Sequence, residues 1–149
     1  MPPNKKGRFR PLVLVIDDSV ETRRAVCFYL SNEGYEVAEA AGGPTAFESV
    51  ALNSPDLVLI DLNMPGPSGV LAAQRLRTIP QMEGVPVVAC AGPDSQAYRD
   101  AARAARADAY LTKPMNPTVL LRLVKGLLNR PASGMTPTHD AMQMAHMVM

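Results

Sequence analysis

Two short apolar runs that each end in aspartate constrain the fold of this chain more than any other feature. Residues 12–16 are Leu-Val-Leu-Val-Ile, followed by Asp17 and Asp18, and residues 57–60 are Leu-Val-Leu-Ile, followed by Asp61. A strand without polar alternation is typical of a parallel sheet that helices cover on both faces. Ligands of such sheets bind beyond the carboxyl ends of the strands, so we expect the three aspartates to form one acidic pocket.

Apolar runs alternate with helical patterns along residues 11–130, which predicts an α/β fold built from five strand–helix units. The expected strands cover residues 11–16, 35–40, 56–60, 85–90 and 109–112. The expected helices cover residues 20–31, 44–53, 68–78, 95–106 and 117–129. Asn116 and Pro117 support the start of the last helix, because asparagine caps helices and proline fits the first helical position.

The length of 149 residues fits a single folded domain, which we place at residues 11–130. Residues 1–10 form a basic N-terminal arm. Residues 131–149 are expected to be a flexible Met-rich C-terminal tail, because they show no core periodicity. A soft-metal site on the methionines and the two histidines of this tail is the alternative.

The composition excludes several classes of function. Charged residues make up 19% of the chain and the formal net charge is +1, so we expect neither a disordered protein nor a nucleic-acid binder. No segment has the length of a secretory signal or a membrane span, which predicts a cytoplasmic protein without membrane contact. Cys27 and Cys90 are expected to be buried free thiols.

The acidic pocket needs a counterion. Crowded carboxylates repel one another and raise each other's pKa unless a divalent cation neutralises them. Mg²⁺ suits carboxylate and phosphate oxygens, and a carboxylate beside it can become an aspartyl phosphate. Lys113 follows the fifth expected strand and would pair with phosphoryl oxygens. Taken singly, Asp17 or Asp18 could instead cap the next helix, and Lys113 could be a solvated surface charge.

Together these residues resemble the receiver domains of two-component response regulators. The resemblance covers about residues 11–128 and rests on three motifs: Asp17-Asp18, Asp61-Leu62-Asn63-Met64-Pro65 with Gly69, and Lys113-Pro114. It implies a flavodoxin-like fold, in which helices cover both faces of a five-stranded parallel sheet with the order 2-1-3-4-5. It also implies a cis peptide bond between Lys113 and Pro114.

The resemblance implies a role for each matching residue of the pocket. Asp61 would be the phosphoacceptor, and Lys113 would contact the phosphoryl group. Mg²⁺ would be bound directly by Asp18 and Asp61, through water by Asp17, and by the backbone carbonyl of Asn63.

Two positions depart from the family pattern. In receivers the fourth strand ends in a Ser or Thr whose hydroxyl binds the phosphoryl group, but here Ala91 stands at that position. A hydrogen bond to a charged group contributes about 1.5–3 kcal/mol, so phosphorylation should be weakly coupled to Tyr110, which matches the aromatic switch position. For Tyr110 a half-buried strand residue is the alternative. Arg106 stands near a frequent glycine, and arginine tolerates a left-handed cap poorly, so we expect that helix to end differently.

We therefore expect a single-domain response regulator that receives phosphate from a sensor histidine kinase or a phosphotransfer protein. A downstream protein would bind Arg99, Arg103 and Arg106, unless these arginines form only a solvated helix face. The alternative function is a docking module that uses the receiver scaffold without phosphate. An independent enzyme is not expected, because an aspartate-nucleophile phosphatase needs a second carboxylate where this chain has Asn63.

Overall fold

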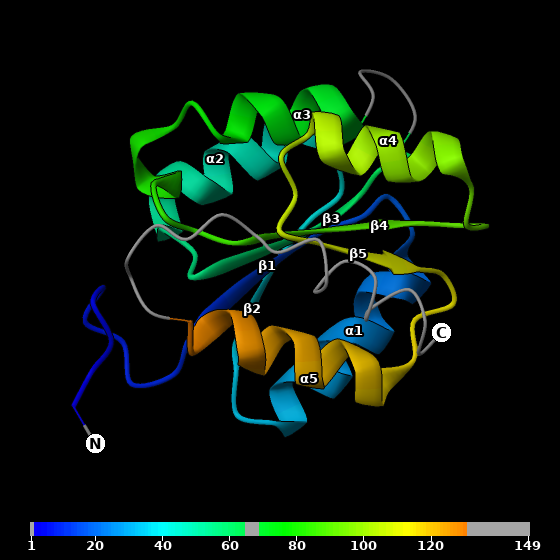
Figure 1. Ribbon diagram of the computed structural model, residues 1–149. Coiled ribbons are helices and arrows are strands. Elements are labelled where there is room, and N and C mark those ends of the chain that lie inside the picture. Colours follow the sequence, from blue (N-terminus) through cyan, green and yellow to red (C-terminus); the bar gives the residue numbers. More distant parts are fainter. Residues whose placement is uncertain (1, 65–68, 131–149) are drawn as a thin grey trace.

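Within the described residues, 2–64 and 69–130, the computed structural model contains five strands in one parallel sheet (Figure 1). Their order is β2-β1-β3-β4-β5, which confirms the predicted fold class and strand order. The strands are β1 (Leu12–Ile16), β2 (Glu36–Ala40), β3 (Leu57–Asp61), β4 (Val87–Ala91) and β5 (Ala109–Thr112). The predicted Met-rich tail, residues 131–149, and Pro65 of the second motif lie outside the described residues.

Helices cover both faces of the sheet. Figure 1 shows α2, α3 and α4 on one face and α1 and α5 on the other. The helices are α1 (Val20–Asn32), α2 (Gly43–Asn53), α3 (Gly69–Leu76), α4 (Gln96–Ala104) and α5 (Pro117–Leu128), with an unpredicted 3₁₀ helix, η1 (Pro80–Met82), before β4. No helix in these parts of the chain has the length and apolarity needed to cross a membrane.

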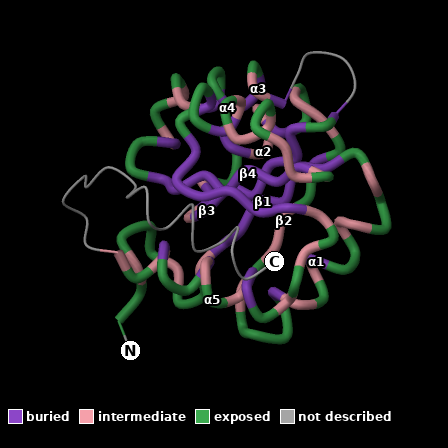
Figure 2. Tube along the Cα trace, turned by 45° about the vertical axis from the view of Figure 1, so that its right-hand side comes forward, coloured by how far each residue is buried: buried purple, intermediate pink, exposed green. Residues whose placement is uncertain are grey.

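The alternation of side chains along the strands gives the sheet two cores. Val13 and Val15 pack with Leu30 of α1 on one face, whereas Leu14 and Ile16 pack with residues of α2 and α3 on the other. Every residue of β1, β3, β4 and β5 is buried. The central strands accordingly appear as buried segments of the trace in Figure 2. Burial on both faces explains why these strands are apolar without polar alternation.

Several element boundaries differ from the prediction by one or two residues. The fourth strand was expected from residue 85, but β4 begins at Val87 because Pro86 has no amide hydrogen for the ladder. At their other ends, β3 includes Asp61 and β4 includes Ala91. The predicted cap of α5 is present, since Asn116 Oδ1 accepts hydrogen bonds from the amides of Thr118 and Val119.

The end of α4 corrects one prediction. Arg106 has a φ of 58°, so this arginine does adopt the left-handed conformation that we expected the chain to avoid. Its amide donates to Arg103 O at 3.0 Å, and Arg77 Nη2 donates to Arg106 O at 2.6 Å. The amide of Ala107 donates to Ala102 O at 3.0 Å. These bonds offset the steric cost that a side chain meets in this conformation.

Both cysteines are free thiols, but only one of them is buried. Cys90 lies in β4 and is 1% exposed. Cys27 lies on α1 and is half-buried, so the prediction of two buried thiols was wrong for this residue. A helix on the sheet surface keeps only one stripe buried, and Val26 and Leu30 occupy that stripe in α1.

The basic N-terminal arm packs against the body of the domain. Asn4 Nδ2 donates to Asp56 Oδ1 at 3.0 Å, and Lys6 Nζ donates to Pro55 O at 2.6 Å. Arg8 Nη1 donates to Ser54 O at 2.7 Å. Asp56 also accepts a hydrogen bond from the amide of Leu12, the first residue of β1. The arm therefore covers the amino ends of β1 and β3, at the opposite edge of the sheet from the aspartates.

Candidate functional site

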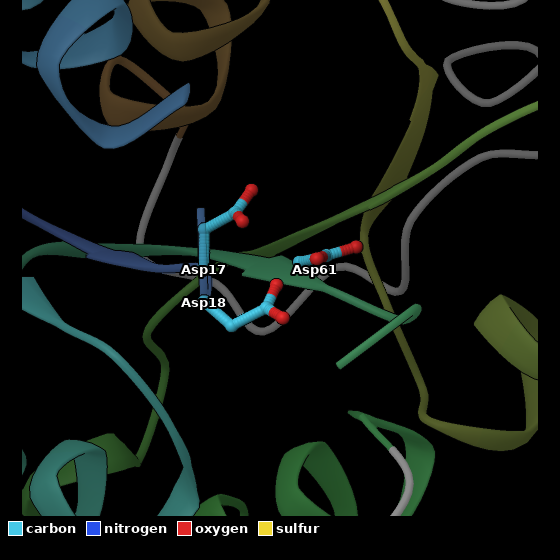
Figure 3. Close-up of side chains that lie close together, drawn as sticks. All are labelled: Asp17, Asp18 and Asp61. Atoms are coloured by element: carbon cyan, nitrogen blue, oxygen red, sulfur yellow. The ribbon is translucent and has the colours of Figure 1, made fainter. Parts of the chain in front are cut away.

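The strand order brings the three aspartates to one place. β1 pairs directly with β3, with Ile16 opposite Ile60, so the residues that follow both strands are neighbours. Asp17, Asp18 and Asp61 each offer a carboxylate oxygen, and these oxygens lie within 4.8 Å of one another. In Figure 3, Asp17 and Asp18 leave the chain on opposite sides, and the carboxylate of Asp18 points toward Asp61. This is the point where the strand order reverses and a crevice opens in such sheets.

The three carboxylates differ in burial. Asp17 is 3% exposed and Asp61 is 2% exposed, whereas Asp18 is exposed at the mouth of the pocket. Asp17 Oδ1 accepts a hydrogen bond from the amide of Ser19 at 2.9 Å. The N-cap of α1 is Ser19, whose hydroxyl accepts from the amide of Thr22. Neither aspartate of the pair is therefore the helix cap that the sequence left open as an alternative.

Lys113 reaches the pocket from the end of β5. Its Nζ lies 2.8 Å from Asp17 Oδ2 and 3.3 Å from Asp61 Oδ2, so it is not merely a solvated surface charge. Burial lowers the pKa of Lys113, but the hydrogen bonds and negative charges of Asp17 and Asp61 outweigh burial, and the pKa is raised. The ammonium group therefore stays charged. The peptide bond between Lys113 and Pro114 is cis.

The charge of Asp61 is only partly compensated. Burial raises the pKa of its carboxyl group, and the nearby Asp17 raises it further. The amide of Asn63, which donates to Asp61 Oδ1 at 2.9 Å, and the Lys113 ammonium lower the pKa, but the net change is a rise. The Lys113 ammonium pairs with the two buried carboxylates, Asp17 and Asp61, and Asp18 adds a third negative charge beside them. Clustered carboxylate oxygens of this kind fit a hard divalent cation such as Mg²⁺.

Two glycines allow close backbone approach at the site, Gly69 between α3 and the end of β3 and Gly92 between the ends of β4 and β5. A Cβ on Gly69, the first residue of α3, would lie 2.4 Å from Asp61 O and 2.6 Å from Leu62 Cα. A Cβ on Gly92 would lie 2.9 Å from Lys113 Cβ. Gly69 belonged to the motif that the sequence indicated, whereas Gly92 was missed. A glycine directly after a buried strand is a signal of close backbone approach that would have identified it.

Comparison with known families agrees with this geometry. The model of the response regulator receiver domain matches residues 13–125. This chain belongs to the response regulator receiver domain family. Receiver domains act in two-component signalling, where they interact with histidine kinases or phosphotransfer proteins, and are signalling domains rather than independent enzymes. They generally bind Mg²⁺ at an acidic pocket, and Asp17, Asp18 and Asp61 form an acidic cluster here.

Individual relatives support the assignment to the receiver family. The transcriptional regulatory protein ResD of Bacillus subtilis is 30% identical over 140 residues, which are 91% of this chain and 57% of ResD. The response regulator PleD of Caulobacter vibrioides is 34% identical over 115 residues, which are 77% of this chain and 25% of PleD. The receiver thus spans little more than half of the first relative and a quarter of the second.

Solved structures show the same fold. A putative response regulator from Chloroflexus aurantiacus has a TM-score of 0.77 at 30% identity, with 81% of this chain and 99% of that chain covered. The chemotaxis protein CheY4 of Vibrio cholerae has a TM-score of 0.75 at 30% identity, with 79% of this chain and 98% of that chain covered.

Ala91 and Tyr110 of this receiver pack in one apolar cluster. Ala91 is fully buried at the end of β4, and Tyr110 of β5 is 1% exposed. The cluster also contains Leu62, Ala89 and Ala102. Tyr110 is thus more deeply buried than the half-buried strand residue that the sequence left open as the alternative. Burial raises the pKa of Tyr110 to about 12, so its phenol group is neutral at ordinary pH.

The arginines of α4 form ion pairs within the receiver. Arg99 Nη2 lies 2.6 Å from Asp94 Oδ2, and Arg103 Nη1 lies 3.4 Å from Asp100 Oδ1. Arg106 is exposed beyond the end of the helix. The positive charge that the sequence indicated on this face is thus partly neutralised by neighbouring carboxylates.

Proposed function

We propose that this chain is a response regulator receiver that accepts a phosphoryl group on Asp61 with the help of Mg²⁺. The observation that carries the proposal is the convergence of three carboxylates within 4.8 Å, with the Lys113 ammonium 2.8 Å from Asp17 and 3.3 Å from Asp61. The donor is a sensor histidine kinase or a phosphotransfer protein in the cytoplasm. The phosphorylated domain then signals through contacts with another protein.

Each residue of the pocket has a distinct part in this proposal. Asp18 and Asp61 would hold Mg²⁺, with Asp17 contributing through water and Asn63 through its backbone carbonyl. The ion would supply positive charge that offsets the repulsion between phosphate oxygens and a carboxylate. A carboxylate oxygen of Asp61 forms a bond to phosphorus while the bond from phosphorus to the donor breaks. Lys113 then pairs with a phosphoryl oxygen.

Phosphotransfer measures this function directly. Radiolabelled phosphate from a panel of purified histidine kinases should be incorporated into the natural protein with Mg²⁺ present. Asp61→Asn should abolish incorporation, because an amide cannot act as the nucleophile. Asp100→Asn is a matched control, since Asp100 is exposed on α4. Equal labelling of the natural protein and Asp61→Asn would contradict the proposal.

A docking module that works without phosphate is the second candidate. It is favoured by Ala91, which has no hydroxyl for a phosphoryl group, and by the complete burial of Tyr110. Spectra recorded with Mg²⁺ and a phosphoryl mimic should show little change around Tyr110, and Ala91→Thr should increase that change. A full change of the Tyr110 signals in the natural protein would show that Ala91 does not weaken the coupling between phosphorylation and Tyr110.

The partner surface proposed for either function includes Arg99, Arg103 and Arg106. An acidic partner would have to compete with Asp94 and Asp100 for two of these arginines. Exposed ion pairs contribute little stability, so this competition would weaken an acidic partner's binding only slightly.

A further inference from the structure

The side chain of Asn63 links two loops at the mouth of the acidic pocket. Its Nδ2 donates to Gly92 O at 2.8 Å, while its backbone amide donates to Asp61 Oδ1 at 2.9 Å. Gly92 is the first residue of the loop between β4 and α4, and Asn63 follows β3. One residue therefore ties the phosphoacceptor proposed above to the neighbouring loop.

The other side of Gly92 is held by Lys113. A Cβ on Gly92 would lie 2.9 Å from Lys113 Cβ and 3.2 Å from Lys113 O, so the two backbones are in close contact. The amide of Lys113 donates to Ala91 O at 2.9 Å, and Lys113 Nζ pairs with Asp61. The contacts form a closed ring from Asp61 through Asn63, Gly92 and Lys113 back to Asp61.

This ring does not depend on the residue at position 91. Ala91 has no hydroxyl that could hold the β4–α4 loop toward a phosphoryl group, and its methyl group packs with Tyr110. The Asn63 side-chain amide provides a polar contact between this loop and the end of β3. The position of the loop is thus set by contacts that exist before phosphorylation.

We propose that Asn63 is a positioning residue whose side-chain amide holds the β4–α4 loop beside Asp61 in the unphosphorylated protein. The loop and Tyr110 consequently adopt the same arrangement with and without a phosphoryl group. The surface around α4 is then presented to partners in both forms, as the second candidate function requires. The significance of this arrangement rests on the proposed function, but its first test does not require phosphate.

The test measures hydrogen exchange in the full chain without metal or phosphate. The amides of Tyr98 and Arg99 report on the loop, because both bond to Ser95 at the start of α4. Asn63→Ala and Asn63→Leu should each lower protection of these amides about threefold, the effect of one weak neutral hydrogen bond. Asn63→Gln keeps an amide donor and should restore part of the protection.

Asn53→Ala is the matched control, because Asn53 makes an exposed side-chain hydrogen bond to Ser49 on α2, away from the pocket. It should leave the Tyr98 and Arg99 amides unchanged. Unchanged protection of these amides in both Asn63→Ala and Asn63→Leu would overturn the proposal.

A second measurement uses the natural protein and remains informative even if the Asn63 variants do not fold. Mg²⁺ and beryllofluoride, a phosphoryl analogue, should change protection of the same two amides by less than about threefold. A larger increase would mean that the loop closes on phosphorylation, which overturns the proposal. Fluorine spectra of the bound analogue report separately whether Asp61 binds it. Absence of binding would count against the proposed function and leave the comparison of unphosphorylated variants valid.

Discussion

The surroundings of Asp61 stabilise the charged form of its carboxyl group only in part. Burial and the charge of Asp17 raise the pKa of its carboxyl group more than the Asn63 amide and Lys113 lower it. Ionisation of Asp61 therefore opposes folding, because the folded protein holds the proton more tightly than the unfolded chain does. At the scale of single residues, the charge of Asp61 therefore lowers the stability of the fold, and the pocket suits the cation and the phosphoryl group of the proposed function.

We expect Asp61→Asn to raise the free energy of unfolding at pH 7 in metal-free buffer. The pKa of Asp61 in the folded protein lies above the ordinary value of 3.8. The natural protein therefore loses stability as the pH rises from the unfolded pKa of Asp61 to its folded pKa. The variant lacks this loss. The free energies of unfolding of the two proteins should converge at lower pH, where Asp61 is protonated in both the folded and the unfolded state. Urea denaturation over a pH series measures the difference.

Asp100→Asn, on the exposed face of α4, is the control for a simple change of net charge. Its stability should stay close to that of the natural protein, because exposed ion pairs contribute little. A lower free energy of unfolding for Asp61→Asn at pH 7 would show that Lys113 compensates the buried charge completely.

At the scale of elements, the contact between α3 and β3 depends on the absence of a side chain at Gly69. The helix begins so close to the strand end that a Cβ would overlap the backbone of Asp61 and Leu62. Backbone atoms cannot rotate away as a side chain can, so the helix would have to shift. The position of Asp61 and Asn63 is thus coupled to the packing of a whole helix.

Gly69→Ala should lower the free energy of unfolding by about 1–3 kcal/mol, the usual cost of overpacking. It should also weaken Mg²⁺ binding, because the Asp61–Asn63 segment has to move. Chemical denaturation and metal titration measure the two effects.

Gly126→Ala provides the matched control for that substitution. Gly126 lies in α5 with no atom within 4 Å of an added Cβ, so alanine should stabilise the helix by up to about 1 kcal/mol. Equal effects of the two substitutions would refute the account of Gly69.

At the scale of the whole molecule, the two ends of the parallel strands have different surroundings. The acidic pocket lies at the carboxyl ends, whereas charged side chains cover the amino ends and stabilise the fold. Asp108, before β5, accepts hydrogen bonds from the amide of Val87, from Arg77 and from Arg130. This joins the segments that follow α3 and α5 to the sheet. The N-terminal arm contacts the same end of the sheet beside α2 through Asn4, Lys6 and Arg8.

Arg8→Ala tests the contribution of the arm. Arg8 donates to the carbonyls of Asn53 and Ser54 at the end of α2 and pairs with Asp56. Its loss should lower the free energy of unfolding by about 1–2 kcal/mol, since carbonyls at a helix end lose a charged donor. Arg10→Ala, at an exposed neighbouring position, should have little effect. Thermal denaturation compares the variants, and an Arg8→Ala protein as stable as Arg10→Ala would contradict this role.

The sequence predicted the five strand–helix units to within one or two residues at most of their ends. Strands buried on both faces carry an uninterrupted apolar pattern, and helix starts carry local caps such as Asn116. Arg106 is one exception: it adopts a left-handed conformation that its hydrogen bonds with Arg103 and with the distant Arg77 help to hold. Cys27 is another, and it is only half-buried because Val26 and Leu30 occupy the buried stripe of α1.

The site likewise has features that the sequence predicted and features that depend on the packing of the chain. Aspartates at strand ends and a lysine after the last strand indicated which residues would gather, because carboxyl ends of parallel strands share one edge. The pattern could not show that Lys113 pairs with Asp17, that Asn63 bonds Gly92, or that Tyr110 is fully buried. Those contacts join residues far apart in the chain, and their existence depends on backbone distances of a few ångströms that are set only when the strands and helices pack together.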